Sequence, residues 1–301
     1  YVEDFYGEYL DQASDAYFQI SYDNEVTIVP EKDGQQLLLA EIGQQVEQAL
    51  QAPRRQNVIV LKSQWTHPQV SAQSLEDLEI NGFLGEFSTR FDASNQSRVN
   101  NVWLASTKIN DYILMPGDIF SFNETVGPRT KERGFAEAGV IRNRQHDVDV
   151  GGGVCQVATT LYNAARKSGM TIVERHGHAS KDFPDPPSNL PTGVDATISE
   201  GWLDLKVKND TNRTYQILLS FDSHHLFGRL LCSEEDACLY QIQNGKISYI
   251  RQDKEIIQLA DVIQTRIDRG SGQPVESRRL YQNKCRIGYP LSSNINIAEK
   301  G

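Results

Sequence analysis

In the first 80 residues of the chain, hydrophobic positions recur with two different spacings, one typical of strands and one typical of helices. Apolar and polar side chains alternate in some segments, as in a half-buried strand, and apolar side chains recur every three to four residues in others, as in a helix. These patterns predict strands at residues 16–22, 25–30 and 57–61, a helix at residues 35–50 and a short capped helix at residues 74–78. The mixture indicates a small α+β domain over residues 1–80.

A longer block, residues 81–232, mixes the same two patterns. They predict helices at residues 100–109 and from residue 154 to just before Gly169, and strands at residues 119–122, 170–176, 203–208 and 215–221. The remaining residues, 233–301, contain two or three strand patterns, including 239–242 and 246–250, and a polar tail. We therefore expect an α+β protein: a small α+β domain, a mixed α/β domain, and a strand-rich C-terminal extension.

Charge and hydropathy narrow the possible partners. The net charge is −10, and no Lys/Arg-rich run is present, which argues against binding to nucleic acid or to an anionic membrane surface. No apolar run approaches the ~20 residues of a membrane span. The first residue is Tyr1 rather than Met, so we expect any signal peptide or membrane anchor to lie upstream of it.

The most informative stretch is a run of glycines followed by a cysteine. Glycine backbones turn sharply and approach a neighbour closely, and Cys155 then lies in the first turn of the predicted helix. The helix dipole favours a thiolate there, and unpaired backbone N–H groups of the first turn stabilise an oxyanion. The expected oxyanion loop comprises Gly151, Gly152, Gly153 and Gln156. This pattern is typical of a cysteine nucleophile, although a buried structural cysteine is compatible with it.

Two histidines follow at the end of the strand predicted at residues 170–176. Side chains alternate along an extended segment, so His176 and His178 are expected to point to the same face and to offer a general base for the thiol. Three more cysteines occur at Cys232, Cys238 and Cys285. A pair between Cys232 and Cys238 and fully reduced thiols are both compatible with the sequence.

Several ordered motifs together resemble the VanW domain. They are Leu-Met-Pro-Gly-Asp-Ile-Phe-Ser-Phe-Asn at 114–123, Val-Gly-Pro-Arg-Thr at 126–130, the glycine–cysteine stretch from 151, Val-Glu-Arg-His at 173–176 and Asp-Ala-Thr at 195–197. The resemblance covers residues 85–228. It implies a bacterial protein at the extracellular face of the cell envelope, and members of the family are reported to be L,D-transpeptidases that form 3-3 cross-links in peptidoglycan through a cysteine.

The same resemblance implies roles for individual residues. Cys155 is expected to form a thioester with a stem peptide, and His178 matches the histidine of the family's Glu-Arg-x-x-His motif, with His176 as the alternative base. Asp195 is expected to orient the histidine, or else to cap a turn. The residues expected to bind the substrate are Asn123, Arg129, Thr130, Arg175 and Tyr162. No cofactor is implied, and the expected partners are peptidoglycan stem peptides.

Other functions stay open at this point. Residues 1–80 are similar in layout to the peptidoglycan-binding domain that often precedes VanW domains, but a packing domain without a ligand has the same layout. A metal-dependent hydrolase would use Cys155, His176 and His178 as ligands. A non-catalytic, wall-binding scaffold linked to glycopeptide resistance would use the glycine loop only for binding. The sequence does not decide whether the acyl acceptor is a second stem peptide or water.

Overall fold

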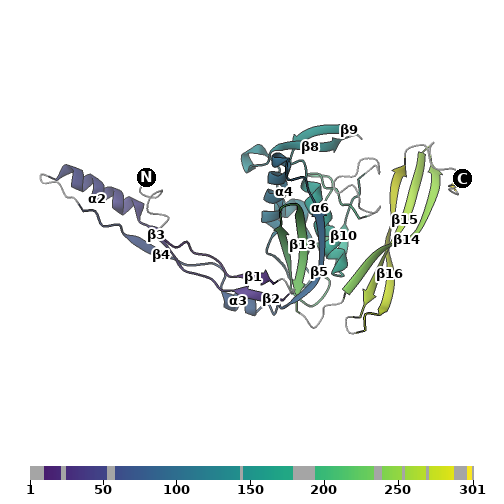
Figure 1. Cartoon of the computed structure of the whole chain (residues 1–301), viewed down its shortest axis with the longest axis horizontal. Coiled ribbons are helices and arrows are strands. Elements are labelled where there is room, and N and C mark those ends of the chain that lie inside the picture. Colours follow the sequence, from purple (N-terminus) through teal and green to yellow (C-terminus); the bar gives the residue numbers. More distant parts are fainter. Residues whose placement is uncertain are drawn as a thin grey trace. The chain divides into compact units, whose positions relative to one another are not determined.

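The computed structural model describes most of the chain and divides it into two compact units, Tyr1–Glu79 and Ile80–Gly301. The described residues are 10–21, 25–52, 58–142, 145–178, 194–233, 239–252, 255–268, 271–287 and 297–299. Helices and strands are mixed in both units (Figure 1), so the expected α+β class is confirmed. No helix among the described residues is long and apolar enough to cross a membrane.

The first unit contains two small antiparallel sheets and two helices. Its elements are β1 (Tyr17–Ile20) paired with β2 (Val26–Val29), β3 (Gly34–Leu37) paired with β4 (Ser63–Thr66), α2 (Leu39–Gln51) and α3 (Ala72–Glu76). Strands β1 and β2 lie within the predicted segments 16–22 and 25–30, and residues 22–24 lie outside the described residues. Helix α3 lies two residues earlier than expected because the Ser71 side chain caps it, accepting a hydrogen bond from Ser74 N at 3.2 Å.

In this unit the predicted helix is present but its start is wrong, and one predicted strand is wrong. The expected helix begins at Leu39 rather than at residue 35, because residues 34–37 pair with residues 63–66 as β3 and β4. The apolar run at 58–61 is not a strand, and Val58 is 77% exposed. Backbone pairing uses N–H and C=O groups that every residue carries, so an apolar run does not by itself specify which segment becomes a strand.

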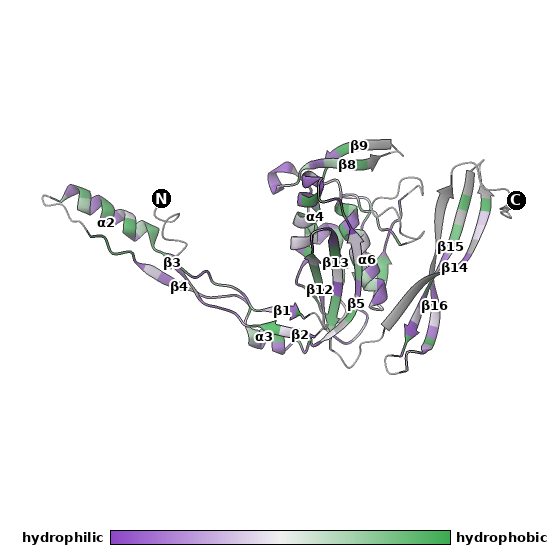
Figure 2. Ribbon diagram, in the orientation of Figure 1, coloured by the Kyte–Doolittle hydropathy of each residue, from purple (hydrophilic) through white to green (hydrophobic). Residues whose placement is uncertain are grey.

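The second unit is built around α6 (Val154–Lys167) and an antiparallel sheet of four strands. The strand order is β5 (Gly82–Arg90), β13 (His225–Cys232), β12 (Tyr215–Phe221) and β6 (Tyr112–Leu114). Helix α6 packs against β5 and β13, and it also contacts α4 (Gln96–Ile109). In Figure 2, hydrophobic stretches appear on β12 and β13 beside these helices.

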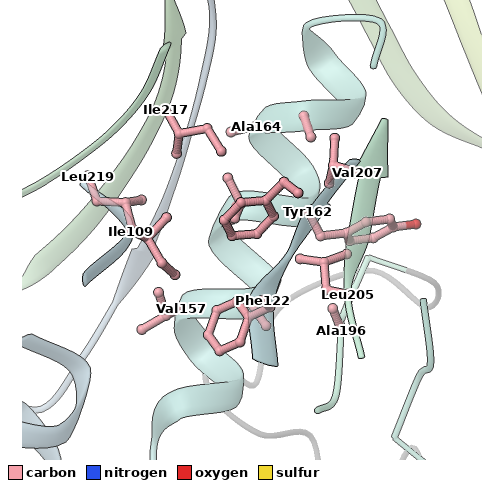
Figure 3. Close-up of a cluster of buried hydrophobic side chains, with 14 of the residues drawn as sticks. Ile109, Phe122, Val157, Tyr162, Ala164, Ala196, Leu205, Val207, Ile217 and Leu219 are labelled. Carbon is pink, nitrogen blue, oxygen red and sulfur yellow. The ribbon is translucent and has the colours of Figure 1, made fainter. Parts of the chain in front are cut away.

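A second, smaller sheet and a hairpin complete the surroundings of α6. The order of the smaller sheet is β10 (Thr171–Glu174), β11 (Lys206–Lys208) and β7 (Ile119–Ser121), and the hairpin is formed by β8 (Glu137–Arg142) and β9 (Gln145–Val150). Figure 3 shows Val207 of β11, and Ile217 and Leu219 of the four-stranded sheet, gathered around α6. Fully burying an aliphatic or aromatic side chain contributes about 1.5–3 kcal/mol, so this cluster holds the unit together.

Helix α6 follows the prediction because its signals are local. Val157, Leu161 and Ala164 are completely buried on its apolar face. The helix ends at Lys167, and Gly169 follows with a φ of 78°, a left-handed conformation that glycine adopts at little cost. The predicted stop at Gly169 is therefore confirmed.

Several boundaries in the second unit differ from the expectation. Helix α4 begins at Gln96 rather than at residue 100, and β11 begins at Lys206 rather than at residue 203. Strand β7 ends at Ser121, because the Ser121 side chain accepts a hydrogen bond from Glu124 N at 3.2 Å and caps α5 (Phe122–Val126). Asn123 therefore lies in a short helix. Strand β10 ends at Glu174, before either histidine, and the hairpin β8–β9 was not predicted.

The C-terminal residues form one sheet rather than short strands and a polar tail. Strands β14 (Leu239–Gln252), β15 (Glu255–Ile267) and β16 (Pro274–Ile287) pair in antiparallel fashion, and β17 (Ile297–Glu299) pairs in parallel with β14. The two segments expected at 239–242 and 246–250 are a single strand with an irregularity between Asn244 and Ile247. Cys232 is a buried free thiol, and Cys238 lies outside the described residues.

Candidate active site around Cys155

The shape of the glycine loop requires glycine at all three positions. Gly151 and Gly153 have φ values of 85° and 103°, which residues with a side chain rarely adopt. A Cβ atom added to Gly152 would lie 2.6 Å from the backbone oxygen of Ala138 in β8. The loop therefore turns twice and lies directly against the hairpin, which fixes the first turn of α6 beside β8.

Cys155 is the second residue of α6 and is half-buried. Its Sγ atom lies 3.6 Å from Thr197 Oγ1 and 3.7 Å from the backbone oxygen of Ile198. Both partners belong to the segment that follows Asp195. The thiol is thus held between the start of α6 and this segment rather than packed inside the core.

Cys155 lines a cavity of about 510 Å³. This volume is in the range of small-molecule sites, which commonly measure about 300–1,000 Å³. The polar side chains of its lining are Cys155, His178, Arg129, Asp149, Thr197, Ser199 and Glu200. Its walls also include the glycine loop, Gly139 and Val140 of β8, and Leu203. The cavity therefore joins the thiol to an imidazole, a guanidinium and two carboxylates.

His178 is oriented by Asp195. The Nδ1 atom of His178 lies 2.9 Å from Asp195 Oδ2, and the His178 backbone N–H donates to the same oxygen at 2.6 Å. Arg175 Nη2 lies 2.8 Å from the other carboxylate oxygen. An ionised Asp195 favours the tautomer with hydrogen on Nδ1, which makes Nε2 the basic nitrogen of the ring.

The ionisation of Asp195 is a balance between burial and its partners. Burial raises the pKa of Asp195, but the hydrogen bond from the His178 ring, the charge of Arg175 and the His178 backbone N–H together outweigh it. The resulting pKa is about 2, below the ordinary value of 3.8. The carboxylate is thus charged at neutral pH.

His176 belongs to a different cluster. Its Nε2 atom lies 3.1 Å from Glu174 Oε1, and Lys206 Nζ lies 2.9 Å from Glu174 Oε2. The hydrogen bonds from Lys206 and His176 lower the pKa of Glu174 to about 2. The expectation of a common face is wrong because β10 ends at Glu174, so strict alternation does not extend to His178. Only His178 lines the cavity with Cys155.

Arg129 lines the cavity and is held from behind by Asn123. Arg129 Nη1 donates to Asn123 Oδ1 at 2.8 Å, and Asn123 Nδ2 donates to the backbone oxygen of Leu203 at 2.8 Å. Burial lowers the pKa of Arg129, while Glu200 and Cys155 act in the opposite direction. An arginine stays protonated in spite of such a shift, so the cavity contains a cation.

The structure separates four other expected site residues from the cavity. Thr130 precedes a 3₁₀ turn at Lys131–Arg133, and Tyr162 is completely buried in the core. Gln156 is also buried, and its Nε2 atom donates to Thr89 Oγ1 at 3.0 Å. Arg175 touches Asp195, and its guanidinium lies 5.3 Å from the Tyr162 ring centroid. Arg175 and Tyr162 are thus placed to support the His178–Asp195 pair from behind.

The expected oxyanion donors need one correction. Gln156 N donates to Gly153 O at 2.9 Å and Val154 N donates to Gly151 O at 3.2 Å, so both amides are engaged within the loop. Gly151 N donates to Ala136 O at 3.1 Å and Gly152 N donates to Asp149 O at 3.4 Å. Among the described residues, the backbone N–H groups of Gly153 and Cys155 make no hydrogen bond to a protein acceptor, so these two amides at the start of α6 are available to bind an oxyanion.

Several cavity residues were not singled out from the sequence. Thr197 lies in the Asp-Ala-Thr motif, and Asp149 lies two residues before Gly151, but neither position carried a chemical signal of its own. Glu200 lies in a turn without a recognisable pattern. Within the described ranges, no three His, Cys, Asp or Glu side chains are grouped to hold a metal ion, so the metal-dependent hydrolase has no ligand set there.

Comparison with known proteins gives consistent matches. The family model described as "VanW like protein" matches residues 97–231. The chain is 38% identical over 213 residues to "Vancomycin B-type resistance protein VanW" of Enterococcus faecalis (strain ATCC 700802 / V583), covering 70% of this chain and 78% of that protein. It is 36% identical over 147 residues to "Uncharacterized protein YoaR" of Bacillus subtilis (strain 168), covering 49% of this chain and 46% of that protein. No solved structure matches.

Proposed function

The chain belongs to the VanW family, and from this premise we propose that it is a cysteine-dependent L,D-transpeptidase that cross-links peptidoglycan. Its substrate is a stem tetrapeptide, and it acts at the extracellular face of the cell envelope. The proposal rests on one observation: Cys155, at the start of α6, and His178, paired with Asp195, line the same cavity. A thiol, a base and a group that orients the base are the parts of a nucleophilic acyl-transfer site.

The reaction has two steps, acylation of Cys155 and transfer of the acyl group to an amine. In the first, His178 removes the thiol proton, Cys155 Sγ bonds to the carbonyl carbon of a stem residue, and the amide bond to the terminal D-amino acid breaks. The leaving amine takes the proton from His178. In the second, an amine of another stem attacks the thioester and its nitrogen bonds to the acyl carbon, while His178 takes a proton from the amine. The C–S bond breaks, and His178 returns this proton to the sulfur to regenerate the thiol.

Two further features support this chemistry. The tetrahedral intermediate carries an oxyanion, and the backbone N–H groups of Gly153 and Cys155 stabilise it, as donors in acyl-transfer enzymes do. Arg129 carries a planar guanidinium that binds carboxylates through paired hydrogen bonds, so its partner is the terminal carboxylate of the departing D-amino acid. Asn123 keeps this guanidinium in place from outside the cavity.

The test is intact mass spectrometry after incubation with a disaccharide-tetrapeptide, and separately with a carbapenem that acylates cysteine nucleophiles. The wild type is expected to gain the mass of the acyl group, and Cys155→Ala is expected to gain none. The matched control is Cys232→Ala, because Cys232 is also a free thiol but is completely buried. This variant should acylate as the wild type does.

Two outcomes would contradict the proposal. Acylation of Cys155→Ala would place the nucleophile elsewhere. A folded wild type that forms no adduct with either compound, and whose Cys155 also resists iodoacetamide, would leave the glycine loop as a binding element only. That result would favour the non-catalytic, wall-binding scaffold. Analysis of the released products separates transfer to an amine from hydrolysis.

A further inference from the structure

Trp202 is a large aromatic side chain in contact with almost nothing. Its relative exposure is 86%, the highest among the exposed large hydrophobic residues of the described chain. It lies between Gly201, at which an added Cβ would have no neighbour within 4 Å, and Leu203, which lines the cavity of Cys155. Glu200, on the other side of Gly201, lines the same cavity, so the turn that carries Trp202 borders the cavity on both sides of the tryptophan.

The turn that carries Trp202 is fixed rather than loose. Ser199 and Leu203 form a backbone bridge, with Ser199 N to Leu203 O at 2.9 Å and Leu203 N to Ser199 O at 3.0 Å. Gly201 provides the left-handed φ of 74° that the turn requires. Asn123 Nδ2 donates to the backbone oxygens of both bridge residues, at 2.8 Å to Leu203 and 3.3 Å to Ser199.

It is unusual for a rigid turn to expose an indole to solvent. An aromatic side chain of this size normally buries a large apolar surface, and a fixed backbone gives it little freedom to fold onto the protein. The polar neighbours Ser199 and Glu200 are exposed and line the cavity as well. The turn beside the cavity therefore carries an exposed indole together with a hydroxyl and a carboxylate that form hydrogen bonds.

We propose that Trp202 is a saccharide-binding platform: its indole stacks on a pyranose ring of the glycan to which the stem peptide is attached. One face of a pyranose ring presents C–H groups, which pack against an aromatic face. The hydroxyl groups at the ring edge are within the reach of polar neighbours such as Ser199 and Glu200. A stem peptide has no comparable flat apolar face, which favours the sugar over the peptide as the partner of the indole.

This inference rests on the proposed function, since it assumes that a glycan-linked peptide enters the cavity. Its test is separate, because it measures binding without turnover. All variants are made in the Cys155→Ala background, and dissociation constants are measured by isothermal titration calorimetry. The ligands are a GlcNAc–MurNAc disaccharide-tetrapeptide and the same tetrapeptide without sugar.

Trp202→Ala is expected to weaken binding of the disaccharide-tetrapeptide about ten-fold and to leave binding of the free tetrapeptide unchanged. Trp202→Phe keeps an aromatic face and should recover part of the loss. The matched control is Trp103→Ala, because Trp103 is 52% exposed on α4 of the same unit and does not line this cavity. It should bind both ligands as the parent does.

Three results would overturn the platform. They are an equal loss for both ligands, which would assign Trp202 to the peptide, no loss for either, and no measurable binding of the disaccharide-tetrapeptide to the parent. Thermal melting of Trp202→Ala, expected to match the parent, excludes unfolding as the cause. If Trp202→Ala loses sugar-dependent binding but the wild type forms no thioester, Trp202 is a saccharide-binding platform and the proposed catalysis is wrong. If the wild type forms a thioester but binding does not depend on Trp202, the proposed catalysis is supported and the platform is wrong.

Discussion

Replacing Asp195 by Asn tests the charge that holds His178. The substitution keeps the shape of the side chain and one carbonyl oxygen, but it removes the negative charge. Asp195 accepts hydrogen bonds from the ring and the backbone of His178 and pairs with Arg175 at 2.8 Å. The variant therefore isolates the electrostatic part of this arrangement.

The expected loss of stability follows from the pKa of Asp195. It is about 2 in the folded protein, compared with an ordinary value of 3.8. Each pKa unit corresponds to about 1.4 kcal/mol, so ionised Asp195 contributes about 2 kcal/mol to the free energy of unfolding at neutral pH. The side chain is only 28% exposed, so solvent screens this contribution little. For a unit of this size, the melting temperature of Asp195→Asn should fall by about 4–8 °C.

The contribution also has a predictable dependence on pH. Because the pKa is lower in the folded than in the unfolded chain, the stabilisation is complete above about pH 4 and is lost as the pH falls toward 2. About half of it remains at pH 3. The difference in stability between wild type and Asp195→Asn should therefore be constant from pH 7 to pH 5 and should shrink below pH 4.

The assay combines urea denaturation at several pH values with the rate of acylation by a carbapenem. Asp195→Asn should acylate about 10²–10⁴-fold more slowly, because the His178 tautomer is no longer fixed. The control is Asp210→Asn, which removes an exposed carboxylate that accepts a hydrogen bond from Thr171 Oγ1. A variant at Asp195 that acylates normally, or whose stability differs from wild type by the same amount at pH 3 and pH 7, would refute this reasoning.

The remaining predictions concern the choice of histidine and the glycine loop. His178→Ala should lower the acylation rate about 10²–10⁴-fold, whereas His176→Ala should change it less than about three-fold, and equal losses in rapid-quench mass spectrometry would count against His178 as the base. Gly152→Ala should cost about 1–3 kcal/mol in urea denaturation because its Cβ would lie 2.6 Å from Ala138 O. Gly139→Ala, with no neighbour within 4 Å of its Cβ, should be nearly neutral, and similar losses for the two would show that the loop tolerates a side chain.

The sequence by itself determined the elements whose signals are local. Helix α6 follows from a glycine run, an apolar face at helical spacing and the stop at Gly169, and all of these lie within twenty residues of one another. The α+β class and the family follow in the same way, from periodic patterns and ordered motifs. These features are predictable because helix formation depends on neighbours along the chain.

The positions of the paired strands were less predictable. In the first unit, residues 34–37 and 63–66 pair as β3 and β4, although the patterns favoured a helix over the first segment and a strand just before the second. In the second unit, hairpin β8–β9 supplies a wall of the cavity without having shown a distinct pattern. Strand pairing joins distant segments through backbone groups that are common to all residues, so the sequence specifies it only weakly.

Tertiary structure alone decided which side chains meet at the site. His176 and His178 are two residues apart, but His176 contacts Glu174 and His178 contacts Asp195. The two side chains diverge because β10 ends at Glu174, before either histidine. Tyr162 and Gln156 lie on the same helix as Cys155, but the packing of α6 buries both. The residues that line the cavity come from five separate segments of the chain. Which side chains meet there depends on where each strand or helix ends and which elements pack together, and these are properties of the whole fold.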